Sequence, residues 1–258
     1  MTKIKLMVIT PYFFPKIGGL ENYALNISKQ LIKDYNYEIV VITSNHETKK
    51  YIKEEVEGIT VYRLPIQFKI SNTPISLKWN KMISIIIEKE NPSVINGHAP
   101  VPFISDIACQ IAHKKQIPFI LTYHSGSMKK QNALIKNILI GIYENYFFKK
   151  TLDLSKKIIC CSDYVKNEFL KDYKNKSITI TPGVNTNLFK PSNIEVKENT
   201  VLFIGNFTNN YQWKGLNYLI EAINSLDNVK LKVIGEGNKI NSKKIDYLGV
   251  MKQKKNSK

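Results

Sequence analysis

The chain has 258 residues, of which 43% are hydrophobic and 23% are charged, and its formal net charge at pH 7 is +17. These proportions are typical of a globular protein and exclude an intrinsically disordered one. Lysine supplies almost all of the basic excess, because Arg63 is the only arginine. Base-edge recognition depends on the rigid guanidinium fork of arginine, so we expect no nucleic-acid partner.

The amino-terminal segment Lys3–Ile9 begins with lysines and apolar residues, as a signal peptide does, but no small-residue cleavage site follows it. It is therefore interpreted as a buried strand. No run of 18 or more apolar residues occurs, so the sequence predicts no transmembrane helix. The three cysteines lack zinc or redox spacing, which indicates free thiols in a reducing cytoplasm; they are Cys109, Cys160 and Cys161.

Short apolar runs predict β-strands, and the stretches between them show helical spacing. The best runs, such as Leu6–Ile9 and Ile39–Ile42, are continuously apolar, which is typical of a strand covered on both faces. Strands that alternate with helices predict a doubly wound, Rossmann-like parallel sheet of the α/β class. The predicted strands are Ile4–Thr10, Glu38–Thr43, Ser93–Asn96, Phe119–Tyr123, Lys157–Cys161 and Ile178–Thr181.

A polar stretch after Phe189–Ser192 interrupts this pattern, and a second strand–helix–strand unit then begins. Its predicted elements are Val201–Gly205, a helix over Leu216–Leu226, and Leu231–Gly235. The ending Met251–Lys258 has no periodicity and is expected to be disordered. The predicted organisation is a first Rossmann-like domain over 1–190, a linker over 191–200 and the start of a second domain over 201–258.

In an open α/β sheet, ligands bind beyond the carboxyl ends of the strands. Five features of the sequence follow predicted strands and are expected at that edge. They are Gly18-Gly19 before the first helix, His98 after the third strand, His124 after the fourth, Ser162 after the fifth and Gly183 after the sixth.

Two interpretations of Gly18-Gly19 stay open, a tight turn or a close approach of a diphosphate to the amino end of a helix. A lone histidine near a strand end is usually structural, but His98 stands in a Gly- and Pro-shaped loop where it can hydrogen-bond a sugar hydroxyl or a leaving group. His124 has a similar placement. No G-x-G-x-x-G, Walker lysine motif or D-x-D pair occurs, so no dinucleotide cofactor, NTP hydrolysis or metal site is predicted.

Several motifs, in this order and spacing, resemble the retaining glycosyltransferases of family four (group 1 type), which have the two-Rossmann-domain GT-B fold. The resemblance covers nearly the whole chain and implies a transferase that uses a nucleotide sugar. The motifs are Thr10–Pro15, Gly18–Glu21, Asn96–His98, Thr122–His124, Cys161-Ser162, Thr181–Asn185, Phe189–Pro191, Phe203–Gly205 and Trp213–Gly215.

The resemblance also implies residue roles. Gly18 and Gly19 would lie against the donor diphosphate, and His98 would contact the donor sugar near the reacting carbon. Lys214 would neutralise the diphosphate leaving group, a charge compensation that needs no metal. His98 and Lys214 are thus the implied catalytic pair. The remaining implied residues are Gly205, Asn206 and Gly215 for the donor, and Glu21, His124, Ser162 and Gly183 for the acceptor side or rim.

Two departures from the family pattern bear on activity. Asn206 stands where the family often has an arginine, so we expect one diphosphate contact to be missing or supplied from elsewhere. The family's pair of glutamates lies beyond Leu248–Val250, so we expect a C-terminally truncated second domain. With one helix, the segment from Val201 onward cannot cover both faces of its sheet, and we expect an exposed apolar patch and loose order there.

An apolar series within 128–150 has two interpretations. Its residues are Leu134, Ile135, Ile138, Leu139, Ile142, Tyr146 and Phe147, with lysines around them. An interfacial helix would make a peripheral membrane contact on anionic lipid. An ordinary helix packed on the first domain explains the stripe equally simply and is favoured.

The sequence therefore predicts an enzyme that moves a hexose-type sugar from a nucleotide-diphosphate donor to a glycan or lipid-linked acceptor. The expected location is the cytoplasm, with a peripheral position at the inner face of the membrane as one option. Retention, metal independence and the absence of a cofactor follow from the resemblance. Two alternatives stay open: an inactive remnant that binds acceptor or nucleotide weakly, and one half of a split enzyme.

Overall fold

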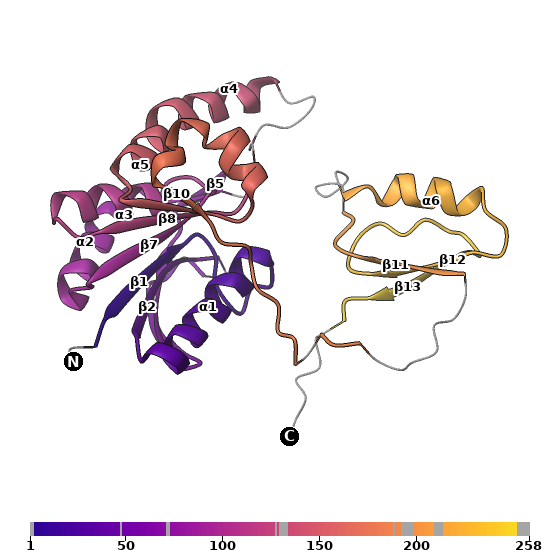
Figure 1. The fold of residues 1–258 in the computed structure, drawn as a ribbon, viewed down its shortest axis with the longest axis horizontal. Helices are drawn as coiled ribbons and strands as arrows, with labels where there is room; N and C mark the ends of the chain where they lie inside the picture. The colour runs from indigo at the N-terminus through magenta and orange to yellow at the C-terminus, as the bar shows by residue number, and fades with distance from the viewer. Residues whose placement is uncertain are drawn as a thin grey trace. The chain divides into compact units, whose positions relative to one another are not determined.

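The computed structural model describes residues 3–46, 48–70, 73–126, 128, 134–187, 189–191, 199–208 and 214–251. The chain divides into two compact units, Met1–Gly183 and Val184–Lys258 (Figure 1). The stretch 191–200, where the sequence predicts a linker, belongs to the second unit, and residues 192–198 within it lie outside the described residues.

The first unit is built on an eight-stranded sheet with the strand order β10-β9-β8-β7-β1-β2-β4-β3. All neighbouring strands run parallel except β3 and β4, which form an antiparallel hairpin at one edge. The chain moves from β1 outward to β2 and β4, then returns to β7 on the other side of β1, which makes the β1–β7 boundary the topological switch point. The strands are β1 (Lys5–Thr10), β2 (Glu38–Asn45), β3 (Ile52–Val56), β4 (Ile59–Pro65), β7 (Val94–Ala99), β8 (Phe119–Tyr123), β9 (Lys157–Cys160) and β10 (Ser177–Thr179).

Alternate residues of β1 enter two separate cores. Met7 and Ile9 belong to the larger cluster of buried side chains, whereas Leu6 and Val8 belong to a second cluster that includes Ala24 of the first helix. Successive side chains of a strand point to opposite faces, so helices cover both faces of this sheet. The doubly wound α/β fold predicted from the continuously apolar runs is confirmed.

The covering helices of the first unit are α1 (Gly19–Tyr35), α2 (Trp79–Glu90) and α3 (Ile104–Lys114). One longer helical stretch follows β8, made of α4 (Leu134–Ile142), a π-helical segment (Tyr143–Phe148) and α5 (Lys149–Leu154). Smaller elements complete the unit: the hairpin β5 (Phe68–Ile70) and β6 (Thr73–Ile75), a π-helical turn over Val165–Phe169 and a 3₁₀ segment over Lys171–Lys176.

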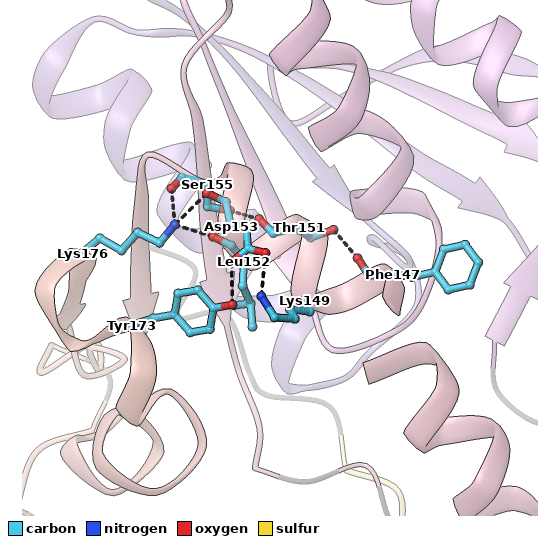
Figure 2. Close-up of polar contacts among 8 residues, drawn as sticks. All are labelled: Phe147, Lys149, Thr151, Leu152, Asp153, Ser155, Tyr173 and Lys176. Atoms are coloured by element: carbon cyan, nitrogen blue, oxygen red, sulfur yellow. Dashed lines mark hydrogen bonds and ion pairs between the residues drawn. The ribbon is translucent and has the colours of Figure 1, made fainter. Parts of the chain in front are cut away.

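Figure 2 shows how the carboxyl end of α5 is held. The ammonium group of Lys176 donates to the main-chain oxygens of Leu152, Asp153 and Ser155 at 2.6, 2.9 and 3.1 Å. The hydroxyl of Tyr173 donates to the Asp153 carboxylate at 2.7 Å. A cation there satisfies carbonyl groups that have no partner within the helix and opposes the negative end of its dipole. This cap fixes the start of β9 against the 3₁₀ segment that leads into β10.

One prediction about the first unit is wrong, and one hairpin of that unit was missed. The strand predicted at Ser93–Asn96 extends to Ala99, because His98 and Ala99 continue the parallel pairing with Thr122 and Tyr123. His98 therefore lies inside β7 rather than after it. The β3–β4 hairpin was not predicted, since β3 is an exposed edge strand whose polar centre, Lys53–Glu55, carries no apolar run.

The second unit contains a parallel three-stranded sheet of β11 (Thr200–Ile204), β12 (Lys230–Ile234) and β13 (Ile245–Gly249). Helix α6 (Leu216–Asn224) covers one face and shares a core with Leu231 and Val233 of β12. The alternate residues of β11 remain open to solvent, with Leu202 53% and Ile204 69% exposed. The predicted exposed apolar patch is therefore confirmed within the described part of this unit.

Candidate functional site

The parallel strands of the first unit end along one edge of the sheet, as the sequence predicts. His98 near the end of β7 and His124 directly after β8 lie side by side there, with ring centroids 5.0 Å apart. Because β7 adjoins β1, the pair stands at the switch point of the sheet, where open α/β sheets bind ligands.

A chain of hydrogen bonds orients both imidazole rings. Asn96 donates through Nδ2 to the carbonyl oxygen of Ile120 at 3.0 Å, which leaves its Oδ1 to accept from Nε2 of His98 at 3.1 Å. Nδ1 of His98 lies 3.0 Å from Nε2 of His124. Since a carbonyl oxygen only accepts, this network assigns the Asn96 amide orientation and then each tautomer in turn. His124 donates through Nε2, and its Nδ1 carries the lone pair.

Burial keeps both rings neutral at pH 7. His98 is 0% exposed, and this burial, together with the His124 ring, holds the pKa of His98 well below its usual value. Burial lowers the pKa of His124 to about 4. A buried imidazole resists protonation because the low-dielectric surroundings disfavour the cation. The pair therefore offers hydrogen bonds, not positive charge, to a ligand at neutral pH.

Other elements hold the pair from the sides. Tyr23 of α1 packs edge-on against both rings, with its centroid 5.8 Å from His98 and 4.8 Å from His124. Ser105 at the start of α3 donates to the main-chain oxygen of His98 at 2.8 Å. Residues from β7, β8, α1 and α3 thus meet at this position, and the geometry of the pair does not depend on one loop.

The loop after β1 brings Gly18 and Glu21 together. Gly18 precedes α1, and a Cβ atom at this position would lie 2.2 Å from Oε2 of Glu21. Glu21 is 7% exposed, and its carboxylate lies 3.8 Å from the ammonium group of Lys16. The negative group at the amino end of α1 in this structure is therefore the protein's own Glu21 carboxylate. Gly19 has no atom within 4 Å of its Cβ position, and at Gly18 the nearest atoms belong to the carboxylate end of the flexible Glu21 side chain.

The other two rim residues of the first unit contribute differently. The hydroxyl of Ser162 accepts from the main-chain NH of Val165 at 3.3 Å and so caps the turn after β9. Gly183 is exposed, with open space at its Cβ position. The structure thus groups His98 with His124 and Gly18 with Glu21, and it gives Ser162 a structural partner.

The second unit brings Gly205 and Lys214 together. Gly205 directly follows β11, and the Nζ atom of Lys214 lies 3.3 Å from its Cβ position. Asn206 is the next residue, and Gly215 directly precedes α6 with a φ of 77°, a conformation that favours glycine. An ammonium group beside an open strand end is suited to an anionic ligand. Trp213 of the same motif lies outside the described residues.

Among the residues that the structure describes, no group of three or more His, Cys, Asp and Glu side chains is placed to hold a metal ion. Nor is any described helix both long and apolar enough to cross a membrane. The described cysteines are free thiols.

A family model described as Glycosyltransferase Family 4 matches residues 17–188, a stretch that carries the histidine pair and the loops around it. The chain belongs to Glycosyltransferase Family 4.

Relatives of this family 4 chain include the uncharacterized glycosyltransferase MJ1178 of Methanocaldococcus jannaschii, 31% identical over 235 residues, or 91% of this chain and 61% of the relative. The gpi3 subunit of phosphatidylinositol N-acetylglucosaminyltransferase from Schizosaccharomyces pombe is 23% identical over 244 residues, or 90% of this chain and 51% of the relative. The chain thus spans between half and two thirds of the length of these relatives.

Solved structures agree on the fold. A glycosyltransferase from Rickettsia africae superposes with a TM-score of 0.61 at 19% identity, over 98% of this chain and 70% of that one. HepE from Anabaena, crystallised with UDP and glucose, gives 0.61 at 13% identity, over 97% and 70%. The family 4 chain therefore has the Rossmann-like α/β fold of the GT-B glycosyltransferases.

The sequence does not single out two residues of the candidate site. Asn96 was noted only as part of a motif, although a polar residue two positions before His98 shares its face of β7 and is a natural partner. Tyr23 carries no local signal, because an aromatic residue in an amphipathic helix is ordinarily part of the core. Only the packing of α1 against the strand ends reveals its contact with both histidines.

Proposed function

We propose that this chain acts in a glycosyltransferase that moves a hexose-type sugar from a nucleotide-diphosphate donor to a hydroxyl of a glycan or lipid-linked acceptor. The reaction would retain the anomeric configuration and would need neither a bound metal nor a cofactor. The observation that carries the proposal is the neutral His98–His124 pair at the switch point of a family 4 domain.

The names of relatives support the substrate class. Phosphatidylinositol N-acetylglucosaminyltransferase subunits of several eukaryotes match this chain, and their name describes transfer of an amino sugar to a lipid. A lipid-linked acceptor would place the enzyme in the cytoplasm, at the inner face of the membrane. The solved complexes of HepE with UDP and glucose support a uridine nucleotide sugar as the first donor to test.

Each group at the site has a proposed task. Lys214, beside Gly205 and Asn206, would neutralise the diphosphate as it leaves, so that charge is stabilised without a metal. His124 would hydrogen-bond a sugar hydroxyl through the lone pair on Nδ1. His98 is fully buried, so a side chain that covers it has to move before His98 itself touches the sugar.

A donor screen tests the proposal. Calorimetry and nucleotide-sugar hydrolysis are measured for the wild-type chain, for His98→Ala and for His113→Ala, an exposed histidine of α3 that serves as the control. We expect one nucleotide sugar to bind with a micromolar Kd, and His98→Ala to weaken binding or slow hydrolysis by about tenfold or more, which corresponds to about 1.4 kcal/mol. His113→Ala is expected to behave as wild type.

The remaining parts of the proposal have their own readouts. The anomeric configuration of the product, followed by NMR, tests retention, and activity in the presence of EDTA tests metal independence. Donor binding without turnover would favour the alternative of a chain that only binds. A folded protein that binds no donor at any concentration tried contradicts the proposal.

A further inference from the structure

The helical stretch after β8 exposes an unusual amount of apolar surface. Six large side chains of this stretch are 48–77% exposed, and we name them the apolar stripe: Leu134, Ile138, Leu139, Ile142, Tyr146 and Phe147. Their spacing follows one side of a helix from α4 into the π-helical segment. Helix α4 lies at the periphery of the first unit, away from the sheet (Figure 1). The side chain of Ile135, also in the predicted series, lies outside the described residues.

The favoured prediction, a stripe packed on the first domain, is wrong for these six residues. The same stretch has a separate inner face, where Tyr143 and Phe148 are 6% and 5% exposed and belong to the main core. Periodicity identifies an apolar side of a helix but does not say what covers it. Single exposed apolar residues are ordinary, whereas a contiguous row marks an interaction surface.

Charge around the apolar stripe favours an anionic lipid surface over a protein partner. The whole chain carries a formal net charge of +17, and in the sequence Lys129 and Lys130 precede the stripe while Lys149 and Lys150 follow it. Lys149 and Lys150 directly follow Phe148, and both are exposed. Lysines and aromatic rings at the border of an apolar helix face are typical of helices that lie in the headgroup region of a bilayer.

The apolar stripe ends beside Phe103, in the loop that leads from β7 into α3. The ring of Phe147 lies 6.2 Å from the ring of Phe103, and Tyr143 lies 5.8 Å from it. Phe103 ends the loop that connects β7, which carries His98, to α3. The stripe is therefore linked to the strand that carries His98 through the short loop 100–103.

We propose that the apolar stripe docks this protein on the surface of an anionic phospholipid bilayer, with the adjacent lysines at the lipid phosphates. The link between docking and catalysis rests on the proposed function, because it assumes that a lipid-linked acceptor reaches the histidine pair from the membrane. The binding itself depends on the apolar stripe and its lysines, and it does not require catalysis.

Vesicle flotation tests the docking. The full chain is mixed with vesicles of phosphatidylcholine alone or with added phosphatidylglycerol, at low and high salt. We expect binding to the anionic vesicles that weakens with salt. The double variant Leu139→Glu/Ile142→Glu is expected to bind at least about tenfold more weakly, because carboxylates replace apolar groups at the interface. Ile85→Glu, at an equally exposed isoleucine of α2 (52%), is the matched control and is expected to float like wild type.

Three results would overturn the docking: no flotation of the wild type, equal flotation of the double variant, or a dimer in light scattering that the double variant dissociates while neither protein binds vesicles. Circular dichroism of the variant establishes that it folds, which is expected because both replaced side chains are exposed. Calorimetry with the nucleotide sugar in solution separates this test from the proposed function. The double variant keeps donor binding if the stripe acts only in docking.

Discussion

The two units of the chain are both parallel sheets with helices, yet they differ in how much polar chemistry they bury. In the first unit helices cover both faces of the sheet, and in the second α6 covers one face while Leu202 and Ile204 stay exposed. All of the buried polar or charged side chains found among the described residues belong to the first unit. A sheet covered on both faces provides enclosed positions where hydrogen bonds can fix a polar group; a sheet covered on one face does not.

Asp106 is a polar side chain that is enclosed and held by hydrogen bonds in the first unit, where helices cover both faces of the sheet. Its carboxylate is 3% exposed and accepts from the main-chain NH of Phe103 at 2.7 Å, the hydroxyl of Tyr143 at 2.8 Å and the hydroxyl of Thr151 at 2.5 Å. Burial raises the pKa of Asp106, although these three donors oppose that shift. The carboxylate ties the rim loop before α3 to the helical stretch that carries the apolar stripe.

The largest effect is expected from Asp106→Ala. Three buried donors lose their acceptor, and each unsatisfied donor costs about 1–3 kcal/mol, so we expect the free energy of unfolding of the first unit to fall by about 3–5 kcal/mol. Urea denaturation followed by circular dichroism measures the change. The comparison of the two units predicts that no substitution of a polar side chain in the second unit has an effect of this size.

Asp153→Ala is the matched control for Asp106. The Asp153 side chain is 48% exposed, pairs with Lys149 at 2.9 Å and accepts an exposed hydrogen bond from the Tyr173 hydroxyl at 2.7 Å. Exposed ion pairs contribute about 0–1 kcal/mol, so a small change is expected. If both substitutions lower the free energy of unfolding by the same amount, burial does not decide the effect, and the comparison of the two units is contradicted.

The pH dependence of stability is expected to have the next largest effect. The folded-state pKa of His124, about 4, lies below its unfolded value near 6.5, so the unfolded state binds more protons between these two values. The free energy of unfolding therefore falls as the pH is lowered from about 6.5 to about 4, by about 3 kcal/mol for His124. His98 adds to the fall in the same direction.

Denaturation at pH 7 and pH 4.5 measures this loss in the wild type and in His124→Gln, which has no imidazole to protonate. We expect the difference in stability between the two pH values to be smaller in the variant. If both proteins lose the same stability on acidification, the buried pair is not the source, and carboxylates elsewhere account for the acid sensitivity.

The sequence predicts the two-sided sheet well and the site less well, for physical reasons that particular residues make clear. Strands β1 and β2 contain the continuous apolar runs Leu6–Ile9 and Ile39–Ile42 because both faces are buried, so a local pattern is enough to find them. The extension of β7 through His98 depends on pairing with β8, which no local pattern contains. The order of strands along the sheet likewise comes from the packing of helices on both faces.

Within the site, the residue types were predictable and their contacts were not. The placement of His98 and His124 at one edge follows from strand–helix alternation, whereas the tautomers depend on the carbonyl oxygen of Ile120 in the neighbouring strand. Gly18 was expected to leave space for a diphosphate, and the structure fills that space with the side chain of Glu21. Contacts of this kind arise from the tertiary fold, so spacing alone does not reveal them.

The smallest effect is expected from Gly235→Ala, which probes the second unit. Gly235 has a φ of 142°, and a Cβ atom there would lie 2.1 Å from the main-chain oxygen of Gly205. A strained residue of this kind costs about 1–3 kcal/mol. Gly183→Ala is the control, because nothing lies within 4 Å of its Cβ position.

Limited proteolysis distinguishes the two units in this last experiment. Because the sheet of the second unit is covered on one face, we expect protease to cleave that unit before the first in the wild type, and faster still in Gly235→Ala. The fragment that corresponds to the first unit should persist equally in both proteins, since its cores share no residue with the second. A second unit that resists protease as well as the first would mean that cover on one face is sufficient for its stability. Faster loss of the first unit in Gly235→Ala would mean instead that the two units stabilise each other.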